Sequence, residues 1–117
     1  LSPYGLRSLS KRYDGRPYAV TVDGVSYTVD YEPAESTTPM YGGNSNWRGP
    51  VWINVNWMVA EGFRDYGFAA LAARLKADAL ALMEREGFRE YYDPLTGQGR
   101  GGEGFSWSAA LALFWTR

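Results

Sequence analysis

A stretch near the start of the chain alternates apolar and polar residues on either side of a short polar break. The break is Asp23-Gly24, the pair favoured in a two-residue type I′ turn. Such a turn places Val20 opposite Tyr27 and gathers the apolar side chains on one face. We therefore predict a β-hairpin over residues 18–31. Because an isolated hairpin is marginal in water, we also expect its apolar face to pack against another part of the protein.

Three longer stretches have helical character. Residues 51–66 follow Pro50 and are apolar on almost every side, whereas residues 68–85 carry one apolar stripe with charged residues away from it. Residues 106–115 are again apolar nearly all round, with Ser106 as the expected N-cap. Because a helix that is apolar on all sides is buried on all sides, we predict that the first and third helices are inner and the second is outer.

These layers predict a mainly α fold, part of an α/α barrel in which an outer ring of helices covers an inner one. Three helices cannot close such a ring, so further copies or sequence outside this chain must supply the remainder. Gly87 is placed to end the second helix. The glycine-rich residues 88–105 then predict a turn-rich loop.

Composition narrows the chemistry that the 117 residues can perform. The net charge of −1, from 12 basic and 13 acidic residues, gives no electrostatic case for binding nucleic acid. The chain has no Cys and no His, so thiol catalysis and the commonest general base and metal ligand are excluded. Catalysis would have to use carboxylates, and we expect no metal or other cofactor. With no apolar run long enough to cross a bilayer, we expect no membrane association and a cytoplasmic location.

Loops that lead into the inner helices should meet at one end of a barrel. They carry residues 42–48, 89–93 and 105–107, which combine amides, carboxylates and the rings of Trp47 and Trp107. Amides both donate to and accept from vicinal hydroxyls, and flat rings pack on the apolar faces of sugars. The combination favours a carbohydrate site.

Each of these residue types also has a structural interpretation. Tryptophans more often lie in a core than against a ligand, and most glutamates are solvated at the surface. Glu84, Glu86 and Glu103 compete with Glu90 for the role of a catalytic carboxylate, and the pattern alone does not choose among them.

Three strings make the choice more specific. They are Gly-Asn-Ser-Asn-Trp-Arg-Gly-Pro-Val-Trp-Ile-Asn-Val-Asn-Trp at 43–57, Glu-Tyr-Tyr-Asp-Pro-Leu-Thr-Gly-Gln-Gly at 90–99 and Phe-Ser-Trp-Ser-Ala-Ala at 105–110. Their order and spacing resemble the C-terminal part of the catalytic domain of glycoside hydrolase family 63, in its mannosylglycerate-hydrolase-like bacterial branch. The resemblance is strong over 40–117 and looser before. It implies that residues 1–117 are a C-terminal segment of a single (α/α)6 barrel, with the hairpin inserted, and that the parent protein hydrolyses an α-glycoside with inversion.

The same resemblance assigns roles to individual residues. Glu90 matches the family's general base, and Arg89 would favour its ionised form if the guanidinium turned the same way. Trp47 and Arg48 match the loop that lines the sugar site, and Trp107 matches the aromatic of a Phe-x-Trp motif. The candidate sugar-binding set is completed by Asn46, Trp52, Asn56 and Tyr91.

One part of the family pattern is missing. The general acid is an Asp in a separate upstream motif, and nothing in residues 1–39 resembles it. We therefore expect that this chain supplies the general base and part of the site for a small carbohydrate of α-glucoside, α-mannoside or glycosylglycerate type. We also expect that the rest of the barrel is a required partner. The isolated chain should then be inactive. The alternative is a non-catalytic sugar-binding or structural fragment that self-associates into a homo-oligomer through its inner helices.

Overall fold

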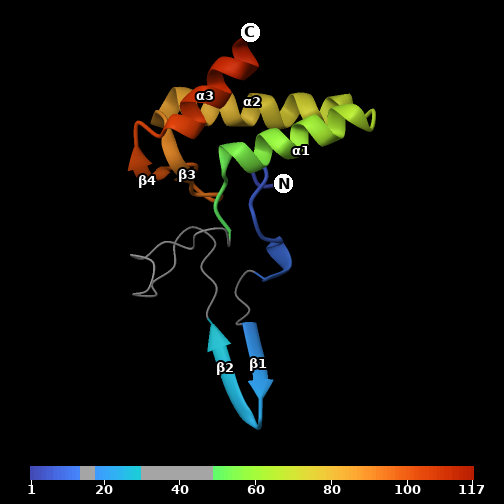
Figure 1. Ribbon diagram of the computed structural model, residues 1–117, viewed down its shortest axis with the longest axis vertical. Coiled ribbons are helices and arrows are strands. Elements are labelled where there is room, and N and C mark those ends of the chain that lie inside the picture. The colour runs from blue at the N-terminus through green and yellow to red at the C-terminus, as the bar shows by residue number, and fades with distance from the viewer. Residues whose placement is uncertain (14–17, 30–48) are drawn as a thin grey trace.

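The computed structural model describes residues 1–13, 18–29 and 49–117 (Figure 1). The described elements, in chain order, are a 3-10 turn at Lys11–Tyr13, β1 (Tyr18–Val22), β2 (Val25–Val29), α1 (Ile53–Asp65), α2 (Ala69–Glu86), β3 (Arg89–Tyr92), β4 (Gly99–Glu103) and α3 (Ser106–Thr116). The three helices lie together, with α1 running alongside α2 and joined to it at one end, and with α3 crossing α2 near its other end (Figure 1).

The hairpin β1–β2 has the predicted register. Val20 lies opposite Tyr27, and both turn residues have positive φ, 50° at Asp23 and 80° at Gly24, as a type I′ turn requires. The predicted packing of its apolar face is not found among the described residues. The hairpin extends away from the helices (Figure 1), and four of its apolar side chains are about half exposed, namely Val20, Val22, Val25 and Tyr27.

Helix α1 begins two residues later than predicted. Val51 is extended and pairs with Tyr92, donating its N–H to the Tyr92 carbonyl at 2.8 Å and accepting the Tyr92 N–H at 2.9 Å. On its other side Val51 forms a bridge with Arg7. Because both backbone groups of Val51 are hydrogen-bonded to Tyr92 in an extended pairing, Val51 does not start the helix, and Trp52 is the extended N-cap.

Helix α2 agrees with its predicted stripe in the middle and at the end. Leu75, Ala79 and Leu82 are buried, and Gly87 ends the helix with a φ of 77° and donates its N–H to the Met83 carbonyl. The predicted cap of α3 was wrong. Ser106 is the first residue of α3, and the N-cap is Phe105, with no side-chain hydrogen bond.

Residues 88–105 are a second antiparallel hairpin and not the predicted loop. Tyr91 of β3 lies opposite Arg100 of β4, and the register shifts between Arg89 and Tyr91. Asp93 holds the turn, because its Oδ1 accepts the backbone N–H groups of Leu95 and Thr96 at 2.8 and 3.1 Å.

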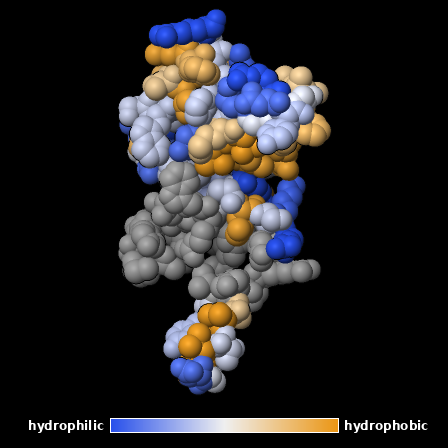
Figure 2. All heavy atoms as spheres, turned by 45° about the vertical axis from the view of Figure 1, so that its right-hand side comes forward, coloured by the Kyte–Doolittle hydropathy of each residue, from blue (hydrophilic) through white to orange (hydrophobic). Residues whose placement is uncertain are grey.

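One buried cluster joins the helices to β3. It consists of Val51, Ile53, Ala60, Leu75, Ala79, Leu82, Met83, Tyr92 and Trp115. The prediction that α1 and α3 are buried on all sides does not hold within the described residues. Met58 of α1 and Trp107, Leu113 and Phe114 of α3 are each more than half exposed, and apolar surface lies over the helices in Figure 2. No helix within the described residues is long and apolar enough to cross a membrane.

Candidate functional site

Glu90 lies in the middle of β3, half-buried, with one carboxylate oxygen anchored. Its Oε2 accepts the backbone N–H of Gly102 in β4 at 3.1 Å. The condition under which Arg89 would favour the ionised form of Glu90, a guanidinium turned toward the carboxylate, is not met. Arg89 pairs instead with Glu103, with Nη1 and Oε1 2.5 Å apart. Neighbouring residues of a strand point to opposite faces, so the two side chains diverge.

The backbone immediately before Glu90 is fixed by two side-chain hydroxyl groups. The Ser108 hydroxyl of α3 donates to the Arg89 carbonyl at 2.7 Å, and Ser108 is buried. The Tyr92 hydroxyl donates to the Gly87 carbonyl at 2.7 Å and accepts the Arg89 N–H at 3.2 Å. Burial raises the pKa of the Tyr92 hydroxyl, so this side chain stays a neutral hydrogen-bonding group.

A second anchor joins the end of α2 to the start of β4. The Gly99 N–H donates to Glu86 Oε2 at 3.0 Å, and Arg85 Nε donates to the other oxygen at 3.0 Å. The Gly99 hydrogen bond, followed by that from Arg85, lowers the pKa of Glu86. The sequence pattern assigned no anchoring role to Ser108 or to the glycines of β4, because these roles depend on a hairpin that the pattern did not predict.

The structure separates the predicted aromatic residues into two environments. Trp52 and Tyr91 stack on each other with ring centroids 5.3 Å apart and an interplanar angle of 32°, and each is only 3% exposed. Trp107 is 51% exposed and forms an edge-type contact with Phe105, with ring centroids 5.4 Å apart and an interplanar angle of 62°. Among the described residues, Trp107 is therefore the predicted ring with a face open to a ligand.

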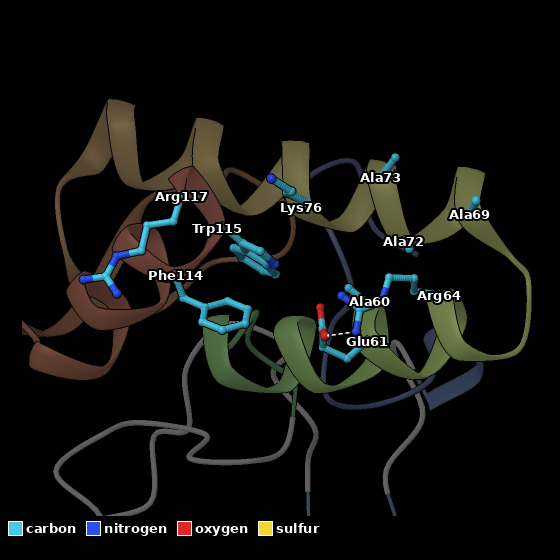
Figure 3. A pocket seen from close by; sticks show the side chains of 10 residues that line it. All are labelled: Ala60, Glu61, Arg64, Ala69, Ala72, Ala73, Lys76, Phe114, Trp115 and Arg117. Atoms are coloured by element: carbon cyan, nitrogen blue, oxygen red, sulfur yellow. Dashed lines mark ion pairs between the residues drawn. The ribbon is translucent and has the colours of Figure 1, made fainter.

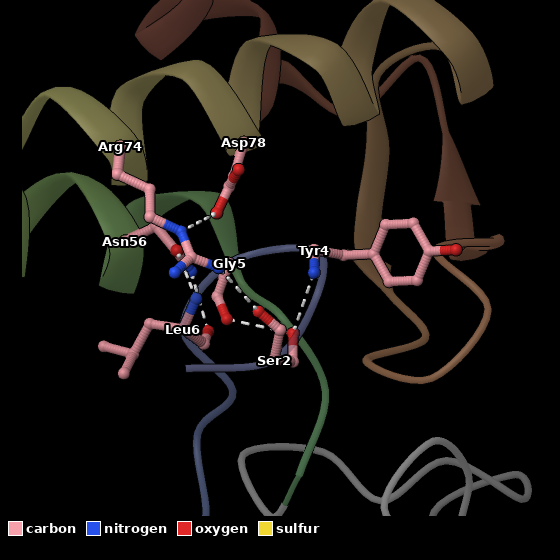
Figure 4. Close-up of polar contacts among 7 residues, drawn as sticks. All are labelled: Ser2, Tyr4, Gly5, Leu6, Asn56, Arg74 and Asp78. Carbon is pink, nitrogen blue, oxygen red and sulfur yellow. Dashed lines mark hydrogen bonds and ion pairs between the residues drawn. The ribbon is translucent and has the colours of Figure 1, made fainter.

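Asn56 is fully buried, and its side-chain amide is hydrogen-bonded to backbone groups of the same chain (Figure 4). Its Oδ1 accepts the Leu6 N–H at 2.8 Å, and its Nδ2 donates to the Leu6 and Trp52 carbonyls, each at 2.9 Å. A Cβ at Gly5 would lie 2.9 Å from this Oδ1, so a glycine lets the amino-terminal segment approach. Both amide protons are used, and sugar binding by Asn56 stays a prediction that this geometry does not favour.

Three of the predicted sugar-site residues lie outside the described residues. They are Asn46, Trp47 and Arg48. Their assignment stays a prediction.

A hollow elsewhere does not contain the candidate residues. It has a volume of about 410 Å3 between α1, α2 and the end of α3, and Figure 3 shows its lining, which includes Glu61, Arg64, Lys76 and Trp115. Arg64 is already paired with Glu61 at 2.5 Å. Within the part of the chain that the structure describes, no group of three acidic side chains converges as a metal site.

Comparison with known proteins identifies the family. A model of the mannosylglycerate hydrolase MGH1-like glycoside hydrolase domain matches residues 21–108. The chain belongs to this family. This confirms the resemblance to glycoside hydrolase family 63, and residues 21–108 include the whole of the β3–β4 hairpin and the first turn of α3.

Individual members of this glycoside hydrolase family are very similar to the chain. A mannosylglycerate hydrolase from Thermus thermophilus is 88% identical over 83 residues, which are 71% of this chain and 20% of that protein. Crystal structures of a family 63 mannosylglycerate hydrolase from Thermus thermophilus also match. The complex with Tris and D-glycerate has a TM-score of 0.62 at 90% identity, over 69% of this chain and 20% of that one. The complex with glucose has a TM-score of 0.64 at 79% identity, over 77% of this chain and 20% of that one. The chain thus spans about a fifth of the length of these relatives.

Proposed function

We propose that this chain forms part of an inverting α-glycoside hydrolase and supplies its general base, Glu90. The observation that carries the proposal is the Glu90 carboxylate, which is held through one oxygen by Gly102 while its other oxygen, Oε1, accepts no hydrogen bond among the described residues. A base needs one oxygen that can receive a proton from water. The similarity to mannosylglycerate hydrolases favours an α-mannoside of glycerate as the substrate, because these relatives share most of the matched residues.

The proposed reaction is a single displacement. The Glu90 carboxylate removes one proton from a water molecule, whose oxygen bonds to the anomeric carbon as the bond to the leaving oxygen breaks. A carboxylic acid on the opposite side, about 6.5–9.5 Å from Glu90, gives its proton to the leaving oxygen. We propose that this acid, and the remainder of an (α/α)6 barrel, lie outside residues 1–117, so that this chain alone does not hydrolyse the substrate. Trp107 would offer its exposed ring to the sugar.

The test uses a chimera in which this chain replaces the corresponding segment of the Thermus thermophilus mannosylglycerate hydrolase. We expect the chimera to hydrolyse α-mannosylglycerate and to release the β-anomer first, as followed by NMR. Glu90→Gln should lower kcat by about a hundredfold to ten-thousandfold with little change in KM, because the amide keeps the shape but cannot take a proton. Glu84→Gln, an exposed change on α2, is the matched control. Near-full activity of the Glu90→Gln chimera, or an α-anomer as first product, would refute the proposal.

A second candidate function rests on the exposed apolar residues of α1 and α3. Met58, Leu113 and Phe114 are each more than half exposed, and such surface favours association between copies. In this interpretation the chain is a structural fragment that self-associates. Sedimentation of the chain should then show an oligomer that Leu113→Lys shifts toward the monomer, whereas a monomer at micromolar concentration would eliminate this candidate.

A further inference from the structure

Strand β4 has one residue more than β3 in the part that faces Glu90. Arg89 pairs with Glu103 and Tyr91 pairs with Arg100, so between these pairs β3 has only Glu90 whereas β4 has the two glycines at 101–102. Two residues facing one define a β-bulge, and the φ of 67° at Gly101 makes it the type whose first residue is a left-handed glycine. Bulges of this kind redirect the groups next to them.

The bulge redirects a backbone N–H toward the Glu90 carboxylate. Gly102 donates to Glu90 Oε2 at 3.1 Å, a contact between a strand backbone and a side chain of its neighbour. The same oxygen has no other hydrogen bond among the described residues. A hydrogen bond to Oε2 restricts rotation about the Cγ–Cδ bond, and because the carboxylate is a rigid planar group, the direction in which Oε1 points is then restricted as well.

Gly101 provides the space for this arrangement. A Cβ built on Gly101 would lie 2.5 Å from Glu90 Oε2, 2.8 Å from Glu90 Cβ and 2.9 Å from Tyr91 Cε1. The distance to Oε2 is far below van der Waals contact, and the carboxylate is the end of a flexible side chain. A residue larger than glycine at 101 would therefore displace the Glu90 carboxylate and, through the close contact with Glu90 Cβ, would also press on the backbone of β3.

We propose that the bulge formed by Gly101 and Gly102 positions Glu90, with the Gly102 N–H fixing Oε2 and the missing side chain of Gly101 leaving room for the carboxylate. The two glycines act through Glu90 and do not touch the substrate. The inference rests on the proposed role of Glu90 as general base. A base must lie within hydrogen-bonding distance of the proton that it removes, and a displacement of about 1 Å can cost on the order of a hundredfold in rate.

The first test detects the contact in the 117-residue chain itself and needs no activity. The amide proton of Gly102 is followed by NMR through the titration of the carboxylates. We expect its chemical shift to change with pH in the wild-type chain and to lose that change in Glu90→Gln, while the amide of Gly104 changes little in either. A Gly102 shift with the same pH dependence in Glu90→Gln would overturn the proposed contact.

The second test measures kinetics in the chimera described above. Gly101→Ala should lower kcat about a hundredfold with KM changed less than about threefold, because the carboxylate moves while the sugar still binds. Gly101→Asn provides a second variant, because asparagine tolerates a left-handed backbone and so isolates the effect of the added side chain from backbone strain. Gly104→Ala is the matched control, since Gly104 also has a positive φ, 60°, but a Cβ there meets nothing within 4 Å.

The background of Glu90→Gln separates positioning from general damage. With the base already removed, adding Gly101→Ala should cause no further loss of kcat, whereas a merely structural role would lower it again. If Glu90→Gln itself keeps its turnover, the proposed function fails. If Glu90→Gln is inactive but Gly101→Ala and Gly101→Asn lose no more than Gly104→Ala, the proposed function stands and the positioning role of the bulge is refuted.

Discussion

Tyr92 allows a direct test of how the backbone before Glu90 is held in place, because a single hydroxyl group can be removed from a side chain that has no exposed surface. The side chain is 0% exposed, and its hydroxyl donates to the Gly87 carbonyl at 2.7 Å and accepts the Arg89 N–H at 3.2 Å. Tyr92→Phe keeps the ring and leaves both backbone groups without this partner. A buried group left unsatisfied costs about 1–3 kcal/mol, so we expect a loss of about 2 kcal/mol in the free energy of unfolding.

The loss should be visible in thermal unfolding followed by circular dichroism. At about 2.1 cal/mol/K of unfolding entropy per residue, a chain of this length gains about 0.25 kcal/mol/K, so 2 kcal/mol lowers Tm by about 8 °C. Tyr66→Phe removes the same hydroxyl from a side chain that is 84% exposed, and should change stability by less than about 0.5 kcal/mol. Equal shifts of Tm in the two variants would show that the Tyr92 hydroxyl adds nothing to stability.

The pH dependence of the stability difference between wild type and Tyr92→Phe tests the role of the Tyr92 hydroxyl independently. Burial raises the pKa of Tyr92 in the folded state above its ordinary value of about 10. The stabilising contribution is therefore complete below pH about 10 and is lost as the pH rises through the folded-state pKa. The stability difference between wild type and Tyr92→Phe should narrow above pH 10 in urea unfolding. A difference that stayed constant to pH 11 would contradict the raised pKa.

Two further predictions concern the other buried anchors. Asn56→Ala should lower stability by about 3 kcal/mol in urea unfolding, because it breaks the hydrogen bonds to the Leu6 backbone in a fully buried site; a loss below about 1 kcal/mol would show that water replaces the amide. The pKa of Glu86 is lowered, first by the Gly99 N–H, so its contribution is present above pH about 4.5 and is lost as the pH falls through the folded-state pKa. Below pH 4.5 the free energy of unfolding should therefore fall less steeply with decreasing pH in Glu86→Gln than in wild type. The exposed change Glu84→Gln should not alter this pH dependence. The same pH dependence in Glu86→Gln and wild type would contradict the role of Glu86 as an anchor.

The sequence predicted those elements whose signals are local. The register of β1–β2 follows from the two turn residues Asp23 and Gly24 alone, and the end of α2 follows from Gly87. The bounds of α1 failed because Val51 pairs with residues more than forty positions away on either side, Arg7 and Tyr92. No pattern within the helix could reveal those partners.

The geometry around Glu90 could not be predicted from the sequence, and the catalytic role of Glu90 stays a proposal. Glu90 could be selected only through the resemblance to a known family, since the chain offers several comparable glutamates. The hairpin that presents it was missed because β4 is Gly-Arg-Gly-Gly-Glu, a composition that strands disfavour. Once the hairpin is known, the strand alternation explains why Arg89 turns away, and the bulge explains the glycines.

The hydrogen bonds between Ser8 and the pair at 49–50 also affect how freely the length of the intervening chain can vary. Ser8 donates its N–H to the Pro50 carbonyl at 3.0 Å and its Oγ accepts the Gly49 N–H at 2.8 Å, so the segment that contains β1 and β2 leaves and returns at one point. A loop with joined ends can double in length for about 0.6 kcal/mol of closure entropy. Relatives can therefore lengthen, shorten or exchange the hairpin segment without disturbing the helices or the strand that carries Glu90.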